Sequence, residues 1–488
     1  MKRIIIWVFM MLHFSVYPIW ALEGVGPAVL VSGQAGNNTY PAVSSINEWL
    51  DTDAFFMAVW QNDSAGNPDI YGKWGYLWSD PWLSDRIIPV TVHPDSDLYP
   101  KVDKDIRQDR YYCVWQSDRT GNWQIFISKG DTLSWSDAMQ ISDGMNCSNP
   151  ALDCSYSTAS NDTAVYLVWQ QDSAGSSTIC CRRFNIPDSA WGAVEIATSD
   201  SAINSRPKIQ AKGDGNFVVL WQRTMADSTD IWQREKTAGS WQAPQRITFD
   251  GRSSRQDYYY TLNGFGLGRT WQSDSSGNSE IYYHADYGSA DLKVTDNSSI
   301  DRNPVTQSVH LVWEGDQAGN FDIYCTNFYL SQPHPILIDS QPSTDINPAL
   351  IIYGCPESEP GACLWQSDRN GKWDIYGVSG FFGPGGVAGK NDKEDSGKIF
   401  LSQNAPNPAS GKTSIDYQIA QPGHVKLKIF NSLGQLVKTL VDKQQMPGKY
   451  DIVWNGLNQS GNKVPSGIYF YRLETGGKST AKKMIYLR

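Results

Sequence analysis

One short tryptophan-centred motif occurs seven times in this chain, and that repetition restricts the possible folds more than any other feature. Most copies read Trp-Gln, with Asp three residues on, Gly at six and Ile at ten. Successive tryptophans lie 42 to 55 residues apart, at Trp60, Trp115, Trp169, Trp221, Trp271, Trp313 and Trp365. Strand-rich repeats of this length are typical of four-stranded propeller blades. The spacing therefore predicts an all-β fold built on a seven-bladed β-propeller.

The composition and the order of signals within one repeat agree with this prediction. The chain has 20 Trp, 24 Tyr, 42 Gly and 25 Pro, which favours strands joined by tight turns. In each repeat a first strand follows a proline-marked start, the second carries the tryptophan and the third carries the isoleucine. The fourth is a short apolar run, as at residues 139–142 and 245–248. The tryptophans are expected to fill the space between neighbouring sheets.

The last repeat lacks a fourth strand, and the missing segment lies at the other end of the chain. After Tyr376 the sequence becomes glycine-rich, whereas residues 28–33 form a short apolar run before the first repeat. Pairing this run with the last sheet closes a ring and removes an exposed edge. We therefore predict a propeller closed by an N-terminal strand. The fourth repeat has Thr224 and Asp227 in place of Asp and Gly, so its turn is expected to differ.

The recurring Asp and Gly are predicted to serve the hairpin between the second and third strands. An Asp that opens a turn accepts backbone N–H bonds, and a Gly after it adopts positive φ without a clash. A calcium site at Asp63–Asp69 is the alternative, but the 12-residue ligand loop with its final Glu is missing. We predict no metal and no cofactor.

Residues 1–21 are interpreted as a secretory signal peptide. Lys2 and Arg3 precede an apolar run from Ile4 to Trp20, and Ala21 offers a small residue for cleavage. The alternative is a short membrane anchor. No later segment reaches about 18 apolar residues, so no transmembrane span is expected after signal removal.

All 8 cysteines follow this segment, and export would permit disulfides. Cys355 and Cys363 flank a turn between two predicted strands, which makes them a possible disulfide pair. The other six have no CxxC spacing, which argues against zinc and leaves 15 possible connectivities.

Charge is distributed unevenly between the two ends of the chain. The net charge is −10, but residues 398–488 contain 13 Lys or Arg and 4 Asp or Glu, which gives +9 and leaves −19 for the rest. An acidic body argues against a nucleic-acid partner, because phosphate contacts need clustered cations.

The C-terminal region is predicted to be a separate small β-sandwich. Residues 22–380 hold the repeats, residues 381–397 form a glycine-rich and charged linker, and residues 398–488 contain six short alternating segments. The predicted strands are 414–419, 424–430, 437–441, 448–454, 467–474 and 480–487.

Several motifs in this region resemble the type A C-terminal sorting domain of the type IX secretion system, which is related to the hook-capping immunoglobulin-like (Ig-like) domain. They are Leu401–Pro408, Val425–Gly434, Gly448–Gly456, Val464–Leu473 and Lys482–Arg488. The resemblance implies a secreted or surface-displayed protein that crosses the outer membrane of a Gram-negative-type bacterium with the type IX machinery as partner. It also implies sorting roles for Gly467, Tyr469, Lys482, Lys483 and Arg488. A purely structural sandwich is the alternative.

The repeats themselves resemble sialidase-type and TolB-like propellers, which share the wording W-x-S-D-x-x-G-N-x-x-I-Y. The sialidase resemblance implies an arginine triad, a Tyr nucleophile backed by Glu, and an acid/base Asp. These roles cannot be assembled from motif matches here, so no catalytic residue is assigned. Whether the protein is an enzyme stays open, with a non-catalytic role favoured.

The residue before each proline position, here called the corner residue, marks a candidate binding site. The corner residues are Tyr40, Tyr99, Asn149, Arg206, Arg255, Asn303 and Asn347, and Arg302 lies beside one of them. They are expected to meet at the channel mouth, where Arg206, Arg255 and Arg302 could hold a carboxylate or sulfate. The alternative is that these arginines are solvated loop ends, paired with Asp257 and Asp301.

Two functions follow from these patterns. The favoured one is a secreted, non-catalytic propeller that binds an extracellular glycan or protein, with Tyr40, Tyr99 and the three arginines as contacts. The alternative is a sialidase-like or other glycan-processing hydrolase or lyase, whose carboxylates cannot be paired from sequence because their separation is three-dimensional.

Overall fold

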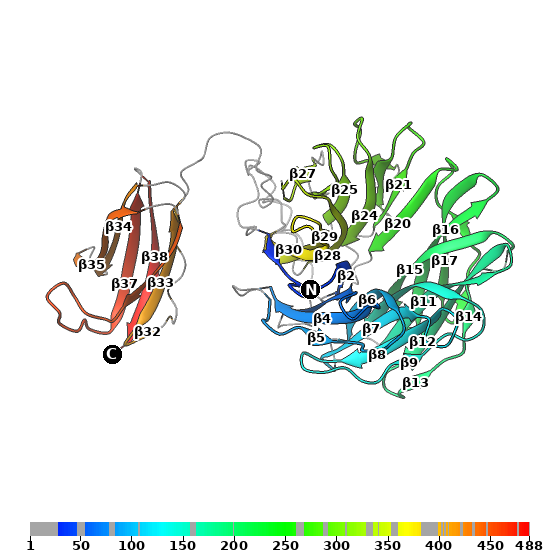
Figure 1. Cartoon of the computed structure of the whole chain (residues 1–488), viewed down its shortest axis with the longest axis horizontal. Coiled ribbons are helices and arrows are strands. Elements are labelled where there is room, and N and C mark those ends of the chain that lie inside the picture. The colour runs from blue at the N-terminus through cyan, green and yellow to red at the C-terminus, as the bar shows by residue number, and fades with distance from the viewer. Residues whose placement is uncertain are drawn as a thin grey trace, which may run out of the picture. The chain divides into compact units, whose positions relative to one another are not determined.

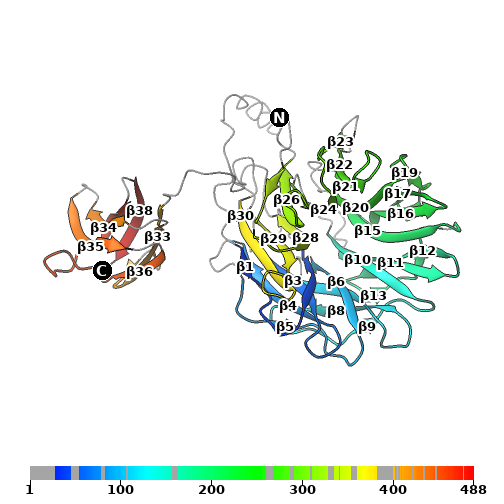
Figure 2. The same cartoon turned by 45° about the horizontal axis from the view of Figure 1, so that its top comes forward.

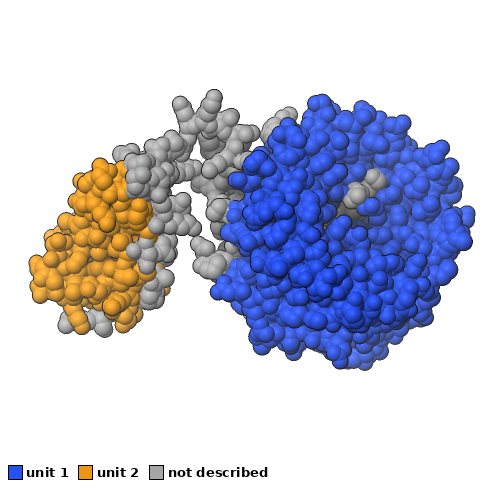
Figure 3. Space-filling view, viewed as in Figure 1, with its two compact units in different colours: residues 1–390 blue, residues 391–488 orange. Residues whose placement is uncertain are grey.

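The computed structural model describes residues 28–45, 54–77, 83–105, 108–156, 163–198, 200–259, 268–285, 291–307, 310–327, 335–339, 341–352, 360–381, 399–401, 404, 407, 409–419, 423–431, 435–445, 448–475 and 478–487. The chain divides into two compact units, residues 1–390 and 391–488 (Figure 3). Every regular element in the described ranges is a β-strand, so the predicted all-β class is confirmed. None of these described segments is a helix with the length and apolar character needed to cross a membrane. The predicted signal peptide and linker lie outside them.

The first unit repeats one pattern of strands, and its first and second strands form a long antiparallel pair in every repeat. The first strands are β2 (Asn38–Val43), β6 (Asp97–Asp105), β10 (Cys147–Tyr156), β15 (Ile203–Gly213), β20 (Ser253–Tyr259), β24 (Asp301–Gln307) and β28 (Asp345–Ile352). The second strands, which carry the tryptophans, are β3 (Phe55–Asn62), β7 (Arg110–Ser117), β11 (Thr163–Ser173), β16 (Asn216–Met225), β21 (Gly268–Ser273), β25 (His310–Gly315) and β29 (Pro360–Ser367).

The third and fourth strands complete each repeat. The third strands are β4 (Asp69–Tyr76), β8 (Gln124–Gly130), β12 (Ser176–Asn185), β17 (Ser228–Thr237), β22 (Glu280–Ala285), β26 (Asp322–Asn327) and β30 (Asp374–Phe381). The short fourth strands are β5 (Ile88–Pro89), β9 (Met139–Gln140), β14 (Glu195–Ile196), β19 (Gln245–Arg246), β23 (Leu292–Lys293) and β27 (Ile336–Leu337). β9 and β19 lie within the predicted runs 139–142 and 245–248. Figure 1 shows first strands near the middle of the unit and fourth strands such as β5 and β9 at its rim.

Two repeats depart from the one-sheet pattern. Repeats 3 and 4 share a ten-stranded sheet, which also includes β13 (Ala190–Trp191) and β18 (Ser240–Trp241). The connection is a single parallel pairing of Ser177 with Ile203, with the Ser177 N–H donating to Ala202 O at 3.1 Å. The β11–β12 hairpin closes with a two-residue turn at Ala174 and Gly175, so Ser177 already lies within β12 and beside the incoming segment.

The last repeat takes its fourth strand from the start of the chain, as predicted. β1 (Val29–Leu30) pairs antiparallel with β30 through Val29–Gly377 and Leu30–Tyr376 (Figure 2). The Val31 N–H then donates to Ile375 O at 2.8 Å. In the first repeat the Val90 N–H donates to Ile70 O at the same distance. The leading segment therefore occupies the place that a fourth strand holds in the other repeats.

Each tryptophan packs into a buried cluster that joins two successive repeats. Trp115 packs with Met57 and Val59 of the preceding repeat, and Trp60 packs with Ile351 and Leu364 of the last one. Six of the seven have at most 1% exposure and Trp271 has 3%. Burying about 150–250 Å² of a tryptophan is worth up to about 4–6 kcal/mol. The predicted role as inter-sheet filler is therefore confirmed.

Several first strands begin with a polar residue whose side chain accepts a hydrogen bond from the indole N–H of the motif tryptophan. Trp60 Nε1 donates to Asn38 Oδ1 at 3.0 Å, and Trp115 Nε1 donates to Asp97 Oδ1 at 3.0 Å. Since a buried N–H without an acceptor costs about 1–3 kcal/mol, these side chains stabilise the tryptophan positions. Sequence reasoning did not identify this role.

The second unit contains two sheets around one core. One has the order β31 (Ile399–Leu401), β33 (Thr413–Ile419), β36 (Gly448–Trp454), and the other has the order β32 (Ala409–Ser410), β38 (Lys478–Leu487), β37 (Gly467–Thr475), β34 (Gly423–Asn431), β35 (Leu436–Gln445). Trp454, Tyr471 and Tyr486 lie in the shared core. The six predicted strands are present, and the parallel pair of β32 with β38 is an addition to the predicted antiparallel pattern.

Candidate functional site

The corner residues adopt a left-handed backbone conformation at one end of the first strands. φ is between 51° and 55° at Tyr40, Tyr99, Asn149, Arg206, Asn303 and Asn347. The pairing register of the first and second strands shifts at each of these positions, as in a β-bulge. A positive φ costs a non-glycine residue roughly 1–2 kcal/mol, so the surrounding structure must compensate.

At five of these six positions, a side chain from the preceding repeat supplies that compensation. It belongs to the residue directly after the motif tryptophan, and its carboxamide or carboxylate oxygen accepts the N–H of the next corner residue. The pairs are Gln61–Tyr99 at 3.1 Å, Gln116–Asn149 at 3.1 Å, Gln272–Asn303 at 3.0 Å, Glu314–Asn347 at 2.7 Å and Gln366–Tyr40 at 3.0 Å. We call this contact the corner clasp. The recurring Trp-Gln was visible in the sequence, but its partner in the next repeat was not.

Tyr40 and Tyr99 come together on neighbouring repeats. Their ring centroids lie 4.6 Å apart at an interplanar angle of 76°, which is an edge-to-face contact. Tyr99 is 36% exposed, while Tyr40 is half-buried. The predicted proximity of these two corner residues is present, and it leaves part of an aromatic surface accessible at this end of the first strands.

The three predicted arginines do not share one environment. The Arg302 Nε donates to Glu314 Oε2 at 2.8 Å, and its guanidinium lies 3.7 Å from the centroid of the Phe321 ring. Glu314 is fully buried, so Arg302 neutralises an interior charge. Arg206 is exposed. Arg255 lies in β20, but its side chain is outside the described part of the structure.

Amide side chains lie beside the aromatic pair at the corner positions. The Asn149 Nδ2 donates to Gln170 Oε1 at 3.0 Å, and the Asn347 Nδ2 donates to Gln366 Oε1 at 2.8 Å. Asn149 is exposed and Asn347 is half-buried. Since a carboxamide carries both donors and an acceptor, such groups can exchange hydrogen bonds with hydroxyl-rich ligands.

The hairpins between second and third strands lie at the same end as the corners, and in five of the seven repeats their Asp and Gly act as predicted. The third repeat closes with a two-residue turn at Ala174 and Gly175 instead. In the second repeat the Gly121 N–H donates to Asp118 O at 2.8 Å, with φ of 88° at Gly121. The Asp118 carboxylate also accepts the Ser96 N–H at 2.9 Å. The fourth repeat instead turns through Ala226, with φ of 51°, so its predicted difference is confirmed.

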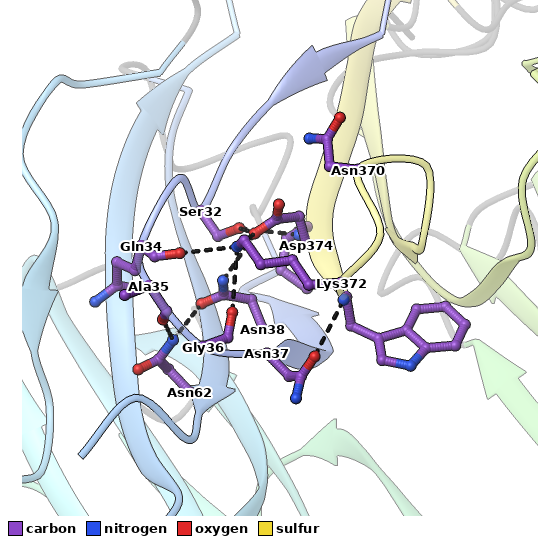
Figure 4. A network of polar contacts seen from close by, with 12 residues as sticks. Ser32, Gln34, Ala35, Gly36, Asn37, Asn38, Asn62, Asn370, Lys372 and Asp374 are labelled. Atoms are coloured by element: carbon purple, nitrogen blue, oxygen red, sulfur yellow. Dashed lines mark hydrogen bonds and ion pairs between the residues drawn. The ribbon is translucent and has the colours of Figure 1, made fainter. Parts of the chain in front are cut away.

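Most acidic groups at the starts of third strands are part of the framework. Asp69 accepts a hydrogen bond from the Thr91 hydroxyl at 3.3 Å, and that hydroxyl accepts the Ile70 N–H at 2.8 Å. In the last repeat Ser32 takes the hydroxyl position, donating to Asp374 at 3.2 Å and accepting the Ile375 N–H at 3.0 Å (Figure 4). A fixed structural partner makes such a carboxylate a poor general base for an external substrate.

The buried Asp103 and the half-buried Asp153 form an acidic pair between first strands. The Asp103 Oδ2 accepts the Cys154 N–H at 2.7 Å, and the Asp153 Oδ2 accepts Gln210 Nε2 at 2.8 Å. Burial raises the pKa of both carboxyl groups, and the charge of Asp103 raises that of Asp153 further. Each carboxyl group therefore bonds to the next repeat along the chain.

The cysteines carry free thiols within the described ranges. These are Cys113, Cys147, Cys154, Cys180, Cys181, Cys325 and Cys363. Burial raises the pKa of the Cys180 thiol to about 12. Cys355 lies outside the described residues, and its predicted disulfide partner Cys363 carries a free thiol in this structure. Within those residues, no group of three or more His, Cys, Asp or Glu side chains is placed to hold a metal ion.

The residues assigned to sorting divide between core and surface. Tyr469 is buried and donates its hydroxyl hydrogen to Pro465 O at 2.8 Å, which gives it a packing role. Lys482 and Lys483 are exposed on β38, and Gly467 is exposed at the start of β37. Arg488 lies outside the described residues.

Comparison with known proteins finds a family for part of the second unit. Residues 403–479 match the FlgD Ig-like domain. No curated protein matches the chain.

Several solved structures are similar to the chain at low identity. The β-propeller domain of the Trilobed protease from Pyrococcus furiosus has 8% identity and a TM-score of 0.42, covering 72% of this chain and 100% of that one. TolB from Acinetobacter baumannii has 11% identity and a TM-score of 0.35, covering 70% and 80%. The polysaccharide lyase Uly1 has 9% identity and a TM-score of 0.45, covering 72% and 90%.

Proposed function

We propose that the first unit is a closed seven-bladed propeller that binds a glycan without chemical turnover, and that the second unit directs its export. The seven-fold count is supported by the seven inter-repeat clusters, of which the last joins Trp60 to Leu364. It is supported again by the corner clasp of Gln366 with Tyr40, which connects the last repeat to the first.

The observation that carries the binding proposal is the set of corner residues held at one end of the first strands. The clasp fixes their backbones, so their side chains are presented with little ordering cost. The accessible edge of Tyr99 offers an apolar face for a sugar ring, and Asn149 offers donors and an acceptor for hydroxyl groups.

The environment of Arg302 favours a neutral glycan over an anionic one. Glu314 neutralises the charge of Arg302, so only two of the three arginines of the predicted anion site remain candidates for binding an anion. Arg206 retains an exposed position, which suits a peripheral contact. A neutral polysaccharide that stacks on tyrosine fits these groups better than a sialylated or sulfated one.

A binding assay on the full chain tests this proposal. Neutral and acidic oligosaccharides are compared on a glycan array and by calorimetry, with Tyr99→Ala and Arg206→Ala as paired variants. We expect neutral-glycan affinity to fall at least tenfold in Tyr99→Ala and less than threefold in Arg206→Ala. Binding only to acidic glycans, abolished by Arg206→Ala, contradicts the neutral-glycan assignment. Turnover of any polysaccharide in the same panel contradicts the non-catalytic role and supports the hydrolase or lyase alternative.

The export role of the second unit is supported by its Ig-like match and by the exposed Lys482 and Lys483 near its end. It is tested by producing the chain with and without residues 398–488 in a bacterium that has type IX secretion. We expect the full chain at the cell surface or in the medium, and the shortened chain in the periplasm. Equal surface display of both forms contradicts a sorting role.

A further inference from the structure

The sixth repeat breaks a rule that the other six follow at the junction of third and fourth strands. In those six, a Ser or Thr hydroxyl accepts the N–H of the motif isoleucine, at distances of 2.8 to 3.0 Å. The hydroxyls belong to Thr91, Ser142, Thr198, Thr248, Thr295 and Ser32. The corresponding residue of the sixth repeat is Asp339, which follows Ile338, whose N–H donates to Ile323 O at 2.9 Å.

This replacement places the Asp339 carboxylate near Asp322, the acidic residue at the start of the third strand. In other repeats the corresponding acidic residue accepts a hydrogen bond from a Ser or Thr hydroxyl. In the fifth repeat, Glu280 accepts the Thr295 hydroxyl hydrogen at 2.6 Å and the Asn297 N–H at 3.1 Å. In the sixth, Asp322 accepts Asn320 Nδ2 at 3.1 Å and feels the negative charge of Asp339. Asp322 has 1% exposure, so water does little to stabilise its charge.

The seventh repeat adds a third carboxylate and one cation. Asp345 is fully buried, and Arg369 Nη2 lies 2.9 Å from its Oδ2. Arg369 Nη1 lies 2.7 Å from Asp339 Oδ2. Arg369 therefore contacts two carboxylates, and the third, Asp322, interacts electrostatically with all three of these groups. The cluster carries an excess negative charge at the boundary between the two repeats. Binding one proton reduces this excess.

We propose a proton-dependent contact between the sixth and seventh repeats. It is formed by Asp322, Asp339, Asp345 and Arg369, and Asp322 binds the proton. Burial is the main cause that raises the pKa of Asp322, and Asp345 and Asp339 add to it, giving about 7. Tyr324 is the titratable neighbour on the same strand, and burial raises its pKa to about 12, so it stays neutral near pH 7.

The sign of the pH effect follows from this shift. The pKa of Asp322 is higher in the folded chain than its ordinary value of 3.8, so the folded state keeps a proton that the unfolded state releases. The contribution to stability is complete below about pH 4 and is lost as the pH rises through about 7. One proton corresponds to up to about a tenfold change in the unfolding constant for each pH unit in this window.

The test measures unfolding of the full chain by denaturant between pH 5 and pH 8. Asp322→Asn removes the titrating group, and Asp339→Thr restores the hydroxyl of the other repeats. We expect Asp322→Asn to lose most of one proton from the pH dependence that the unmodified chain shows between pH 5 and 7. Asp339→Thr is expected to lose a smaller part of it, because burial and Asp345 still raise the pKa of Asp322. The exposed Asp137→Asn serves as the control and keeps the full dependence.

Hydrogen exchange locates the effect. Amides of β26 and β28 are expected to exchange at least fivefold faster at pH 8 than at pH 5, after correction for intrinsic rates. This difference is expected to vanish in Asp322→Asn and to shrink in Asp339→Thr. If both variants retain the pH dependence of the unmodified chain, the proton binds to another group and the proposed proton-dependent contact is refuted. If Asp322→Asn does not fold, Asp339→Thr decides alone.

Discussion

The Gln366 side chain accepts the backbone N–H of Tyr40 at 3.0 Å, although the two residues are 326 positions apart in the chain. The same contact joins other successive repeats, for example Gln116 with Asn149 at 3.1 Å. The last and first repeats are thus connected by the same device that connects neighbours within the chain. The contact between the last and first repeats therefore includes a side-chain hydrogen bond, in addition to the pairing of β1 with β30.

Replacing Gln366 by Ala is predicted to destabilise the first unit by about 1–2 kcal/mol, because the Tyr40 N–H loses its acceptor in a strained conformation. Gln366→Met keeps the size of this buried side chain but has no oxygen acceptor, and it is expected to cost at least half as much as Gln366→Ala. Denaturant unfolding at pH 7 measures both. A Gln366→Met variant as stable as the unmodified chain would show that the acceptor is not the source of the effect.

Ser32→Ala is predicted to destabilise the contact of the segment after β1 with β30 by about 1–3 kcal/mol, because Asp374 and the Ile375 N–H both lose a hydroxyl partner. Ser32→Thr matches the residue type at Thr91 and should retain most of the stability. The measurement is hydrogen exchange of β30 in the full chain. Unchanged protection of β30 in Ser32→Ala argues against a closing role for this contact.

Arg302→Ala is predicted to cost about 2 kcal/mol, because the fully buried Glu314 loses its cation. Arg252→Ala removes an exposed side chain and is expected to change stability by less than about 0.5 kcal/mol. Thermal unfolding of the two variants compares them directly. A similar small effect in both would mean that Arg302 is available to a ligand after all.

Asp153→Asn is predicted to reduce the pH dependence of stability on the acidic side of neutrality. Burial first, and then the charge of Asp103, raises the pKa of Asp153. The folded state therefore holds a proton that the unfolded state releases above about pH 4, so this contribution is lost as the pH rises. Unfolding curves recorded at several pH values, with Asp137→Asn as control, measure it. A steeper dependence in Asp153→Asn would contradict the assigned direction.

Local patterns predicted the strand order of this protein in detail. The fourth strands, the Asp and Gly turns and the exceptional turn at Ala226 all lie where the repeat motif placed them, because turn chemistry depends on residues close in sequence. The partner of the leading strand was also predictable, since only one repeat lacked a fourth strand. The joined sheet of repeats 3 and 4 was not, because it depends on a single contact between Ser177 and Ile203.

The sequence by itself determined the all-β class, the repeat and the two units, because hydrophobic periodicity and turn residues act over short distances. Only the tertiary structure decided which polar side chains are available at the corner positions. Arg302 and Arg206 look alike in the sequence, but one neutralises the interior Glu314 and the other is exposed. Burial and charge pairing depend on neighbours that folding brings from other repeats, and no local pattern records them.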